Sequence, residues 1–162
     1  TLSLHDALPI YAAAVGEVNV VAEMKRTHSV IGGEGNGGVI YPESHYGRDA
    51  LVGVGLFLSH YVAQSKKMTE LKSTYPPYFI SKNKMTLSPD MDVDKILEGL
   101  KERYATEKVT DIDGVKIDFA QGWVHLRKSN TEPIIRIYSE AKDEAAANQL
   151  AEEVIAAAKS TF

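Results

Sequence analysis

The sequence predicts a segment of mixed helices and strands followed by an α+β domain. Residues 78–162 alternate between period-two and helical-period apolar patterns, in the order strand, helix, three strands, helix. The links between these strands are of hairpin length, so we expect a four-stranded antiparallel sheet with both helices on one face. Tyr75, Pro76 and Pro77 break the helical pattern that precedes them, which predicts a hinge or linker at 75–77.

The first segment contains two helical patterns separated by short strand-like runs. We expect a helix over 15–26 and strands over 30–33 and 39–41. Residues 50–66 are apolar nearly all round, which predicts a helix buried on most of its faces. Asp49 precedes that helix, where its carboxylate can accept from the first free N–H groups and act as the N-cap.

The second domain has clearer element boundaries. Strands are expected over 78–87, 115–119, 123–126 and 134–138, with helices over 93–104 and from residue 143 onward. Asp90, Asp92 and Asp94 precede the first of these helices, where acidic residues favour the helix N-terminus through its dipole. This string is not an EF-hand, because positions 95 and 101, which would need Gly and Glu, are both Lys.

Composition excludes several classes of protein. The chain has 162 residues, of which 44% are hydrophobic and 25% charged, which is typical of a globular protein. It contains no cysteine, so it has neither disulfides nor a thiolate metal site, and we expect a cytoplasmic protein. The formal net charge is −4. Because the basic residues form no broad stripe along the sequence, a local anion site is favoured over a nucleic-acid surface.

The N-terminal residues 1–10 do not fit the rest of the chain. Their apolar residues are interrupted by His5, Asp6 and Pro9, and they lack the basic and apolar regions of a signal peptide. They resemble translated adapter sequence, so we expect a non-native leader and exclude it from the fold. No apolar run is long enough to span a membrane.

A polar loop between the last two predicted strands concentrates groups that bind oxyanions. Arg127 offers a planar fork of donors, Ser129 and Thr131 offer hydroxyls, and Asn130 offers an amide. Pro133 cannot donate to a sheet and marks where strand pairing resumes. From the residues alone, a hairpin loop with a solvated arginine explains the pattern equally well.

A glycine-rich loop at 33–38 follows the first predicted strand. Its glycines allow a sharp turn or a close approach to a ligand, but no Lys-Ser or Lys-Thr follows as in a P-loop. Glu34 and Asn36 could bind neighbouring hydroxyls of one sugar ring; the alternative is a plain tight turn. Further along, His45 and Arg48 could face a substrate cleft, or they belong to a surface loop that caps the next helix.

These two motifs together resemble those of the α-D-phosphohexomutases, which include phosphoglucomutases, phosphomannomutases and phosphoglucosamine mutases. The family's phosphate-binding loop, R-x-S-N-T-E-P-x-x-R, is matched by Arg127, Ser129, Asn130, Thr131, Glu132, Pro133 and Arg136. Residues 33–38 are similar to its sugar-binding loop, G-E-x-S-G-H. Asn36 stands where the family has Ser, and Gly38 where many members have His. The resemblance covers nearly all of residues 11–162.

The resemblance implies a fold and a set of binding residues. Residues 11–74 would end the family's third, α/β domain, and residues 78–162 would form its fourth, TATA-binding-protein-like domain. The family moves a phosphoryl group on a hexose phosphate through a phosphoserine and a sugar bisphosphate. It implies sugar contacts from Glu34 and Asn36. It implies phosphate contacts from Arg127, Ser129, Asn130, Thr131 and Arg136, while Glu132 and Pro133 shape the loop.

The catalytic parts of the family are not found in this sequence. There is no Ser-His-Asn-Pro segment to carry the phosphoserine, and the Asp90–Asp94 string departs from the family's metal loop, D-G-D-x-D-R. We therefore expect no catalytic residue and no metal ligand in the chain, with Mg²⁺ bound by the missing N-terminal domains of the parent. The chain would be inactive alone.

The substrate is a finer question. Residues 41–50, together with Gly38, are most similar to bacterial phosphoglucosamine mutases, so glucosamine phosphate is the first expected substrate. A phosphoglucomutase or phosphomannomutase is the alternative, as is a non-catalytic phosphosugar-binding module. We expect a phosphosugar as partner, with no nucleic acid and no membrane.

Overall fold

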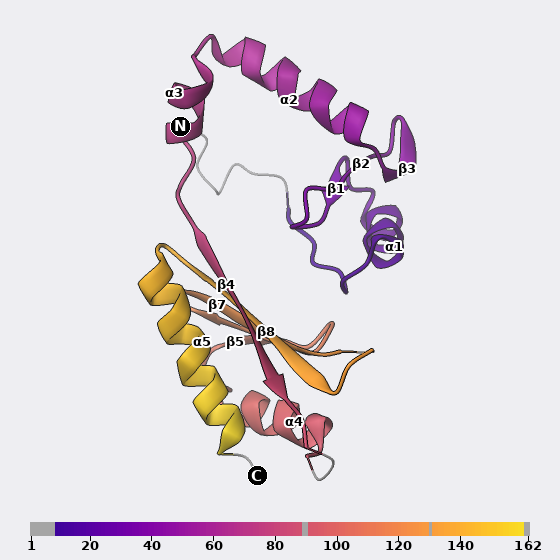
Figure 1. The fold of residues 1–162 in the computed structure, drawn as a ribbon. Helices are drawn as coiled ribbons and strands as arrows, with labels where there is room; N and C mark the ends of the chain where they lie inside the picture. Colours follow the sequence, from indigo (N-terminus) through magenta and orange to yellow (C-terminus); the bar gives the residue numbers. More distant parts are fainter. Residues whose placement is uncertain (1–8, 89–90, 130, 161–162) are drawn as a thin grey trace. The chain divides into compact units, whose positions relative to one another are not determined.

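The computed structural model describes residues 9–88, 91–129 and 131–160, and these form two compact units, 1–75 and 76–162 (Figure 1). Each unit is described by itself. The expected leader comprises residues 1–10, and residues 1–8 of it lie outside the described residues.

The first unit combines three helices with a small sheet. The three short strands pair antiparallel in the order β1-β2-β3. The segment expected as a loop at His45–Arg48 is strand β3. Asp49 caps α2 as predicted, since its carboxylate accepts from the N–H groups of Leu51 and Val52 at 2.8 and 3.0 Å. The elements are α1 Glu17–Thr27, β1 Gly32–Gly33, β2 Val39–Tyr41, β3 His45–Arg48, α2 Ala50–Gln64 and α3 Met68–Ser73.

The prediction that the helix at 50–66 is buried on most faces is wrong for this structure. No residue of α2 is buried, and Leu51 and Val62 are 83% and 73% exposed. Within the unit, α2 mainly contacts β2 and α3, which cover little of its circumference. An apolar pattern on all sides indicates that a helix can be buried. Whether it is buried depends on the segments that pack against it, and the helix sequence does not determine these.

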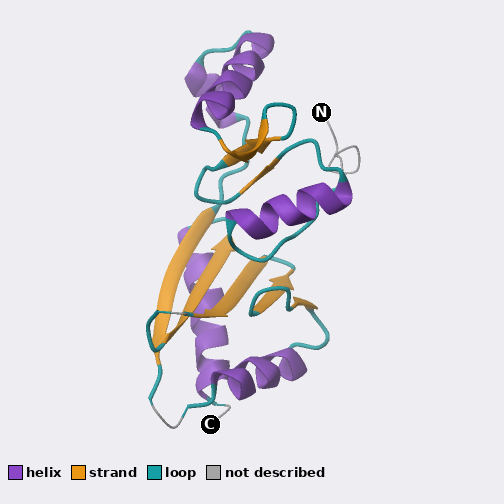
Figure 2. Ribbon diagram, turned by 90° about the vertical axis from the view of Figure 1, so that its right-hand side faces the viewer, coloured by secondary structure: helices purple, strands orange, loops and turns teal. Residues whose placement is uncertain are grey.

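The second unit is an α+β layer pair, which confirms the predicted class. Its strands pair antiparallel in the order β4-β8-β7-β6-β5, and the strands are orange in Figure 2. The sheet has five strands, not the predicted four. The additional strand, β5, contains only three residues and pairs at the edge, so it is too short to show a period-two pattern. The elements are β4 Phe79–Thr86, α4 Val93–Arg103, β5 Lys108–Thr110, β6 Val115–Phe119, β7 Gly122–Lys128, β8 Ile134–Ala141 and α5 Glu144–Lys159.

Both helices of the second unit pack on one face of the sheet, as predicted. The strand register places alternate apolar residues on this face, where they meet Ile96 and Leu100 of α4 and Leu150 and Val154 of α5. The strand residues of this core are Met85, Val115, Ile117, Val124, Leu126, Ile135 and Ile137. Among the described residues of this unit, no helix lies on the opposite face of the sheet. We call it the open face; its residues are the alternate positions of the same strands, which are mostly polar but include Ile80, Trp123 and Ile134.

Candidate functional site

Two arginines lie directly opposite each other on the open face, beside the polar loop. The register of β7 and β8 pairs Arg127 with Arg136. Like charges in this position repel, so each needs a compensating partner. Arg127 Nη1 donates to Asp113 Oδ2 at 3.1 Å, and Arg136 Nη2 lies 3.7 Å from Glu132 Oε2. The register thus places two arginines side by side on neighbouring strands, and each guanidinium has more N–H donors than its acidic partner uses.

The loop between these strands is organised by Ser129. This residue is buried, its N–H donates to Ile134 O at 3.0 Å, and its hydroxyl oxygen accepts from the N–H groups of Thr131 and Glu132 at 3.4 and 3.3 Å. Thr131 is exposed at the loop surface, where its hydroxyl can reach a ligand. Asn130, which is also a predicted phosphate ligand, lies outside the described residues.

Asp113 is a site residue that sequence reasoning missed. It belongs to the turn between β5 and β6, and Gly114 beside it has φ +74°, a conformation that favours glycine. A Cβ on Gly114 would lie 2.2 Å from the backbone oxygen of Leu126, so only glycine allows the turn to approach β7 this closely. The Asp-Gly pair before a strand signals a turn, but which strand that turn meets is not encoded locally.

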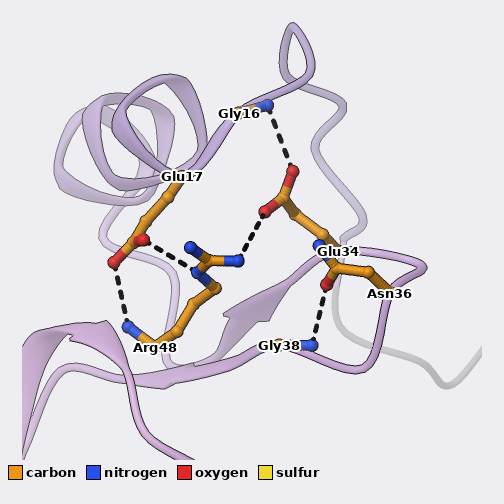
Figure 3. A network of polar contacts seen from close by, with 6 residues as sticks. All are labelled: Gly16, Glu17, Glu34, Asn36, Gly38 and Arg48. Atoms are coloured by element: carbon orange, nitrogen blue, oxygen red, sulfur yellow. Dashed lines mark hydrogen bonds and ion pairs between the residues drawn. The ribbon is translucent and has the colours of Figure 1, made fainter.

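In the first unit, the glycine loop is tied to the start of α1 (Figure 3). Glu34 Oε1 accepts from the N–H of Gly16, the N-cap of α1, at 3.1 Å. Asn36 Oδ1 accepts from the N–H of Gly38 at 3.0 Å, and the N–H of Gly37 donates to Glu34 O. The Asn36 side chain therefore fixes the loop backbone, whereas the Glu34 side chain ties the loop to α1. Each retains unused acceptor or donor capacity for a hydroxyl.

Arg48 links this loop to α1 through Glu17, which sequence reasoning also missed. Its backbone N–H and its Nε–H donate to the two carboxylate oxygens of Glu17 at 3.0 and 2.8 Å. Its Nη1 lies 3.9 Å from Glu34 Oε2 (Figure 3). A Cβ on Gly38 would lie 2.6 Å from Arg48 Cδ, so the arginine crosses the space that a side chain at position 38 would occupy. A larger side chain at position 38 would therefore have to displace Arg48.

A pocket of about 570 Å³ opens between the glycine loop and the start of α2. Arg48 and Asn36 line it, together with Glu17, Gly37, Gly38, Val39, Asp49 and Ala50. The other predicted cleft residue, His45, instead places its Nε2 3.0 Å from Asp49 Oδ2, on the N-cap of α2. The structure thus brings Arg48 together with the sugar-binding loop and holds His45 at a capping carboxylate.

The hydrogen bonds from Arg48, first from its backbone N–H and then from its side chain, lower the pKa of the Glu17 carboxyl, and the His45 charge adds a smaller effect. Because the folded-state pKa lies below the ordinary value near 4.5, the pair stabilises the unit above that pH and its contribution is lost as the pH falls below it. In an NMR titration of the side-chain carboxyl carbons, Arg48→Met should raise the Glu17 midpoint only partly, because the backbone N–H of residue 48 still donates to Glu17.

Glu23 provides the internal control for this titration. Its pKa is also lowered, but by the side-chain hydrogen bond from Arg26 on the same helix. Its midpoint should stay in place in Arg48→Met. A Glu17 midpoint that does not respond to the loss of Arg48 would contradict the pairing.

The described residues do not form a site for Mg²⁺ or a membrane span. In residues 9–88, 91–129 and 131–160, no three His, Asp or Glu side chains gather closely enough to hold a metal ion. Within the same ranges, no helix combines the length and apolar character needed to cross a bilayer.

Both units of the chain match domains of one known protein family. The sequence profile of the phosphoglucomutase/phosphomannomutase alpha/beta/alpha domain III matches residues 5–78, and that of the C-terminal domain of the same family matches residues 82–157. The chain belongs to the phosphoglucomutase/phosphomannomutase family. The two matches fall in the family's order, on the first and second units respectively.

Individual relatives support the same assignment. The chain is 39% identical to the phosphoglucosamine/phosphogalactosamine mutase of Sulfurisphaera tokodaii over 86% of its own length, and 39% identical to a phosphoglucomutase/phosphomannomutase of Thermococcus kodakarensis over 93%. It spans 31% and 33% of these relatives. A family protein from Burkholderia thailandensis shares the fold, with a TM-score of 0.70 at 23% identity, covering 91% of this chain and 31% of that protein.

Proposed function

We propose that this chain supplies the sugar-binding and phosphate-binding loops of a phosphohexomutase. The reaction would interconvert the 6-phosphate and 1-phosphate of a hexose or hexosamine through a phosphoserine and a bisphosphate intermediate. The observation that carries the proposal is the pair Arg127 and Arg136, which lie opposite each other at the loop. Two arginines on neighbouring strands can supply the positive charge and the paired donors that a phosphate dianion binds.

The binding residues have separate tasks in this proposal. Arg127 and Arg136 hold the phosphate that does not react, with the hydroxyls of Ser129 and Thr131 and the amide of Asn130 completing the loop. Glu34 and Asn36 hold the ring hydroxyls. Because phosphoryl transfer depends mainly on positioning and charge stabilisation, fixing the remote phosphate and the ring sets the orientation of the reacting oxygen.

Glucosamine phosphate is the proposed first substrate. The Sulfurisphaera tokodaii relative is named for amino sugars, and it is as similar to this chain as the relative named for glucose and mannose phosphates. Glucose and mannose phosphates are therefore the alternatives. Direct comparison of the 2-amino and 2-hydroxyl sugars decides between them.

The catalytic serine and the Mg²⁺ ligands are proposed to lie in parts of the parent protein that the relatives contain and this chain does not span. No set of described residues fits a Mg²⁺ ion, so no step of the proposal uses one here. The exposed apolar side chains of α2, among them Leu51 and Val62, would be covered by those parts. We place a hinge at 75–77, where the two units join.

Calorimetric titration tests the proposal. Glucosamine 6-phosphate should bind the chain, whereas glucosamine should not bind detectably, because the arginine pair recognises the phosphate. The ratio of the affinities for glucosamine 6-phosphate and glucose 6-phosphate measures the preference for the amino sugar. With Mg²⁺ and a trace of sugar bisphosphate, the chain alone should show no mutase turnover above blank. Binding of glucosamine as tight as that of its phosphate would overturn the proposed site, and turnover would overturn the placement of the serine.

A further inference from the structure

The arginine pair is part of a longer row of cations across the open face. The register of β4 and β8 places Lys84 directly opposite Arg136, which in turn lies opposite Arg127. Three basic residues from three adjacent strands therefore stand side by side. In a chain whose net charge is −4, this concentration of positive charge is local and costs stability through repulsion.

The positive charges of this row are only partly paired with carboxylates. Arg127 pairs with Asp113 and Arg136 lies near Glu132. Lys84 is exposed, and no carboxylate in the described ranges (9–88, 91–129 and 131–160) lies within ion-pair distance of its amine. The row is thus complementary to an anion placed over its centre, above Arg136.

Other cations of the open face have partners within the sheet itself. Lys82, on the same strand and face as Lys84, lies over the ring of Tyr138, with its amine 5.7 Å from the ring centroid. Lys116 lies over the ring of Trp123 and pairs with Asp118. Lys84 differs from these lysines, although it shares their face.

We propose that Lys84 is a third cation of the phosphate-binding site, held on β4 opposite the arginine pair. This inference rests on the proposed function, because the ligand is the same phosphosugar. Neighbouring strands lie about 4.8 Å apart, so the backbones of Lys84 and Arg127 are about 10 Å apart with Arg136 between them. Long side chains from both sides can converge on one phosphoryl group above the central strand. Lysine contributes charge and not bidentate orientation.

The dianion is the form of phosphate that a third cation favours. A phosphate ester loses its second proton with a pKa of about 6, so at pH 7.5 it is mostly dianionic and at pH 5 mostly monoanionic. Loss of Lys84 should therefore weaken binding more at pH 7.5 than at pH 5. A purely structural role of Lys84 would predict the same loss at both pH values.

Calorimetric titration with glucosamine 6-phosphate and with inorganic phosphate, at fixed low salt, tests the inference. At pH 7.5, Lys84→Met should weaken binding about threefold to tenfold, within the range for an exposed charged hydrogen bond, and Lys84→Arg should restore most of it. The matched control is Lys82→Met, which removes the same charge from the same strand and should change affinity less than about twofold. Neither variant should lower the unfolding temperature by more than a few degrees, because both lysines are exposed, and Lys84→Met also relieves repulsion within the row.

The outcomes separate this inference from the proposed function. If the unaltered chain binds neither ligand, both fail. If it binds and Lys84→Met binds equally well, only the assignment of Lys84 fails. An equal loss in Lys82→Met, or tighter binding of a single-stranded oligonucleotide that both variants weaken alike, would show a diffuse polyanion surface and overturn the assignment.

Discussion

Arg127→Ala is expected to weaken binding of glucosamine 6-phosphate by about tenfold to a hundredfold. Hydrogen bonds to charged groups contribute about 1.5–3 kcal/mol, and the fork of Arg127 is already oriented by Asp113 before a ligand arrives. Arg127→Lys should recover only part of the affinity, because a compact ammonium cannot bind two phosphate oxygens in one plane. Titration calorimetry at fixed salt measures both variants.

Lys128 is the matched control for this experiment. It follows Arg127 on β7, but the register pairs it with Ile135 and not with Arg136, so it points to the opposite face of the sheet. Lys128→Ala removes one positive charge close to the site and should leave affinity nearly unchanged. If it costs as much as Arg127→Ala, binding depends on general charge and not on a directed clamp.

Ile137→Ala should lower the free energy of unfolding of the second unit by about 2–5 kcal/mol. Ile137 is fully buried on β8, where its register neighbours are Asn83 on β4 and Leu126 on β7. Removing its side chain leaves a cavity at the centre of the sheet, where the surrounding strands can relax only partly. Urea unfolding followed by fluorescence of Trp123 measures the change, because this is the chain's one tryptophan and lies within the same unit.

An exposed isoleucine provides the control. Ile112 is 53% exposed in the turn after β5, and Ile112→Ala makes the same chemical change where little packing is lost. Its effect should stay within about 0.5 kcal/mol. Equal destabilisation by both variants would mean that the β8 position is not the packed centre of this unit.

Most elements of the second unit could be predicted because their patterns are local. The alternation of Ile135 and Ile137 with polar residues identifies β8, although the strand continues to Ala141, beyond the predicted end. The short edge strand β5 has too few residues to alternate, and it forms because β6 offers it a pairing partner. The burial of α2 was predicted wrongly for the same reason, since burial depends on neighbours and not on the helix's own residues.

The candidate site likewise has features that the sequence alone determines and features that depend on the tertiary structure. By itself the sequence determined which side chains stand in the polar loop, and that Arg127 and Lys128 point to opposite faces, because both follow from adjacent positions on one strand. Only the tertiary structure decided that Arg136 and Lys84 stand in one row with Arg127. It also decided that Asp113 orients Arg127 and that Glu17 holds Arg48. These contacts depend on strand register and on turns that bring distant residues together, and no local pattern of residue types encodes such register.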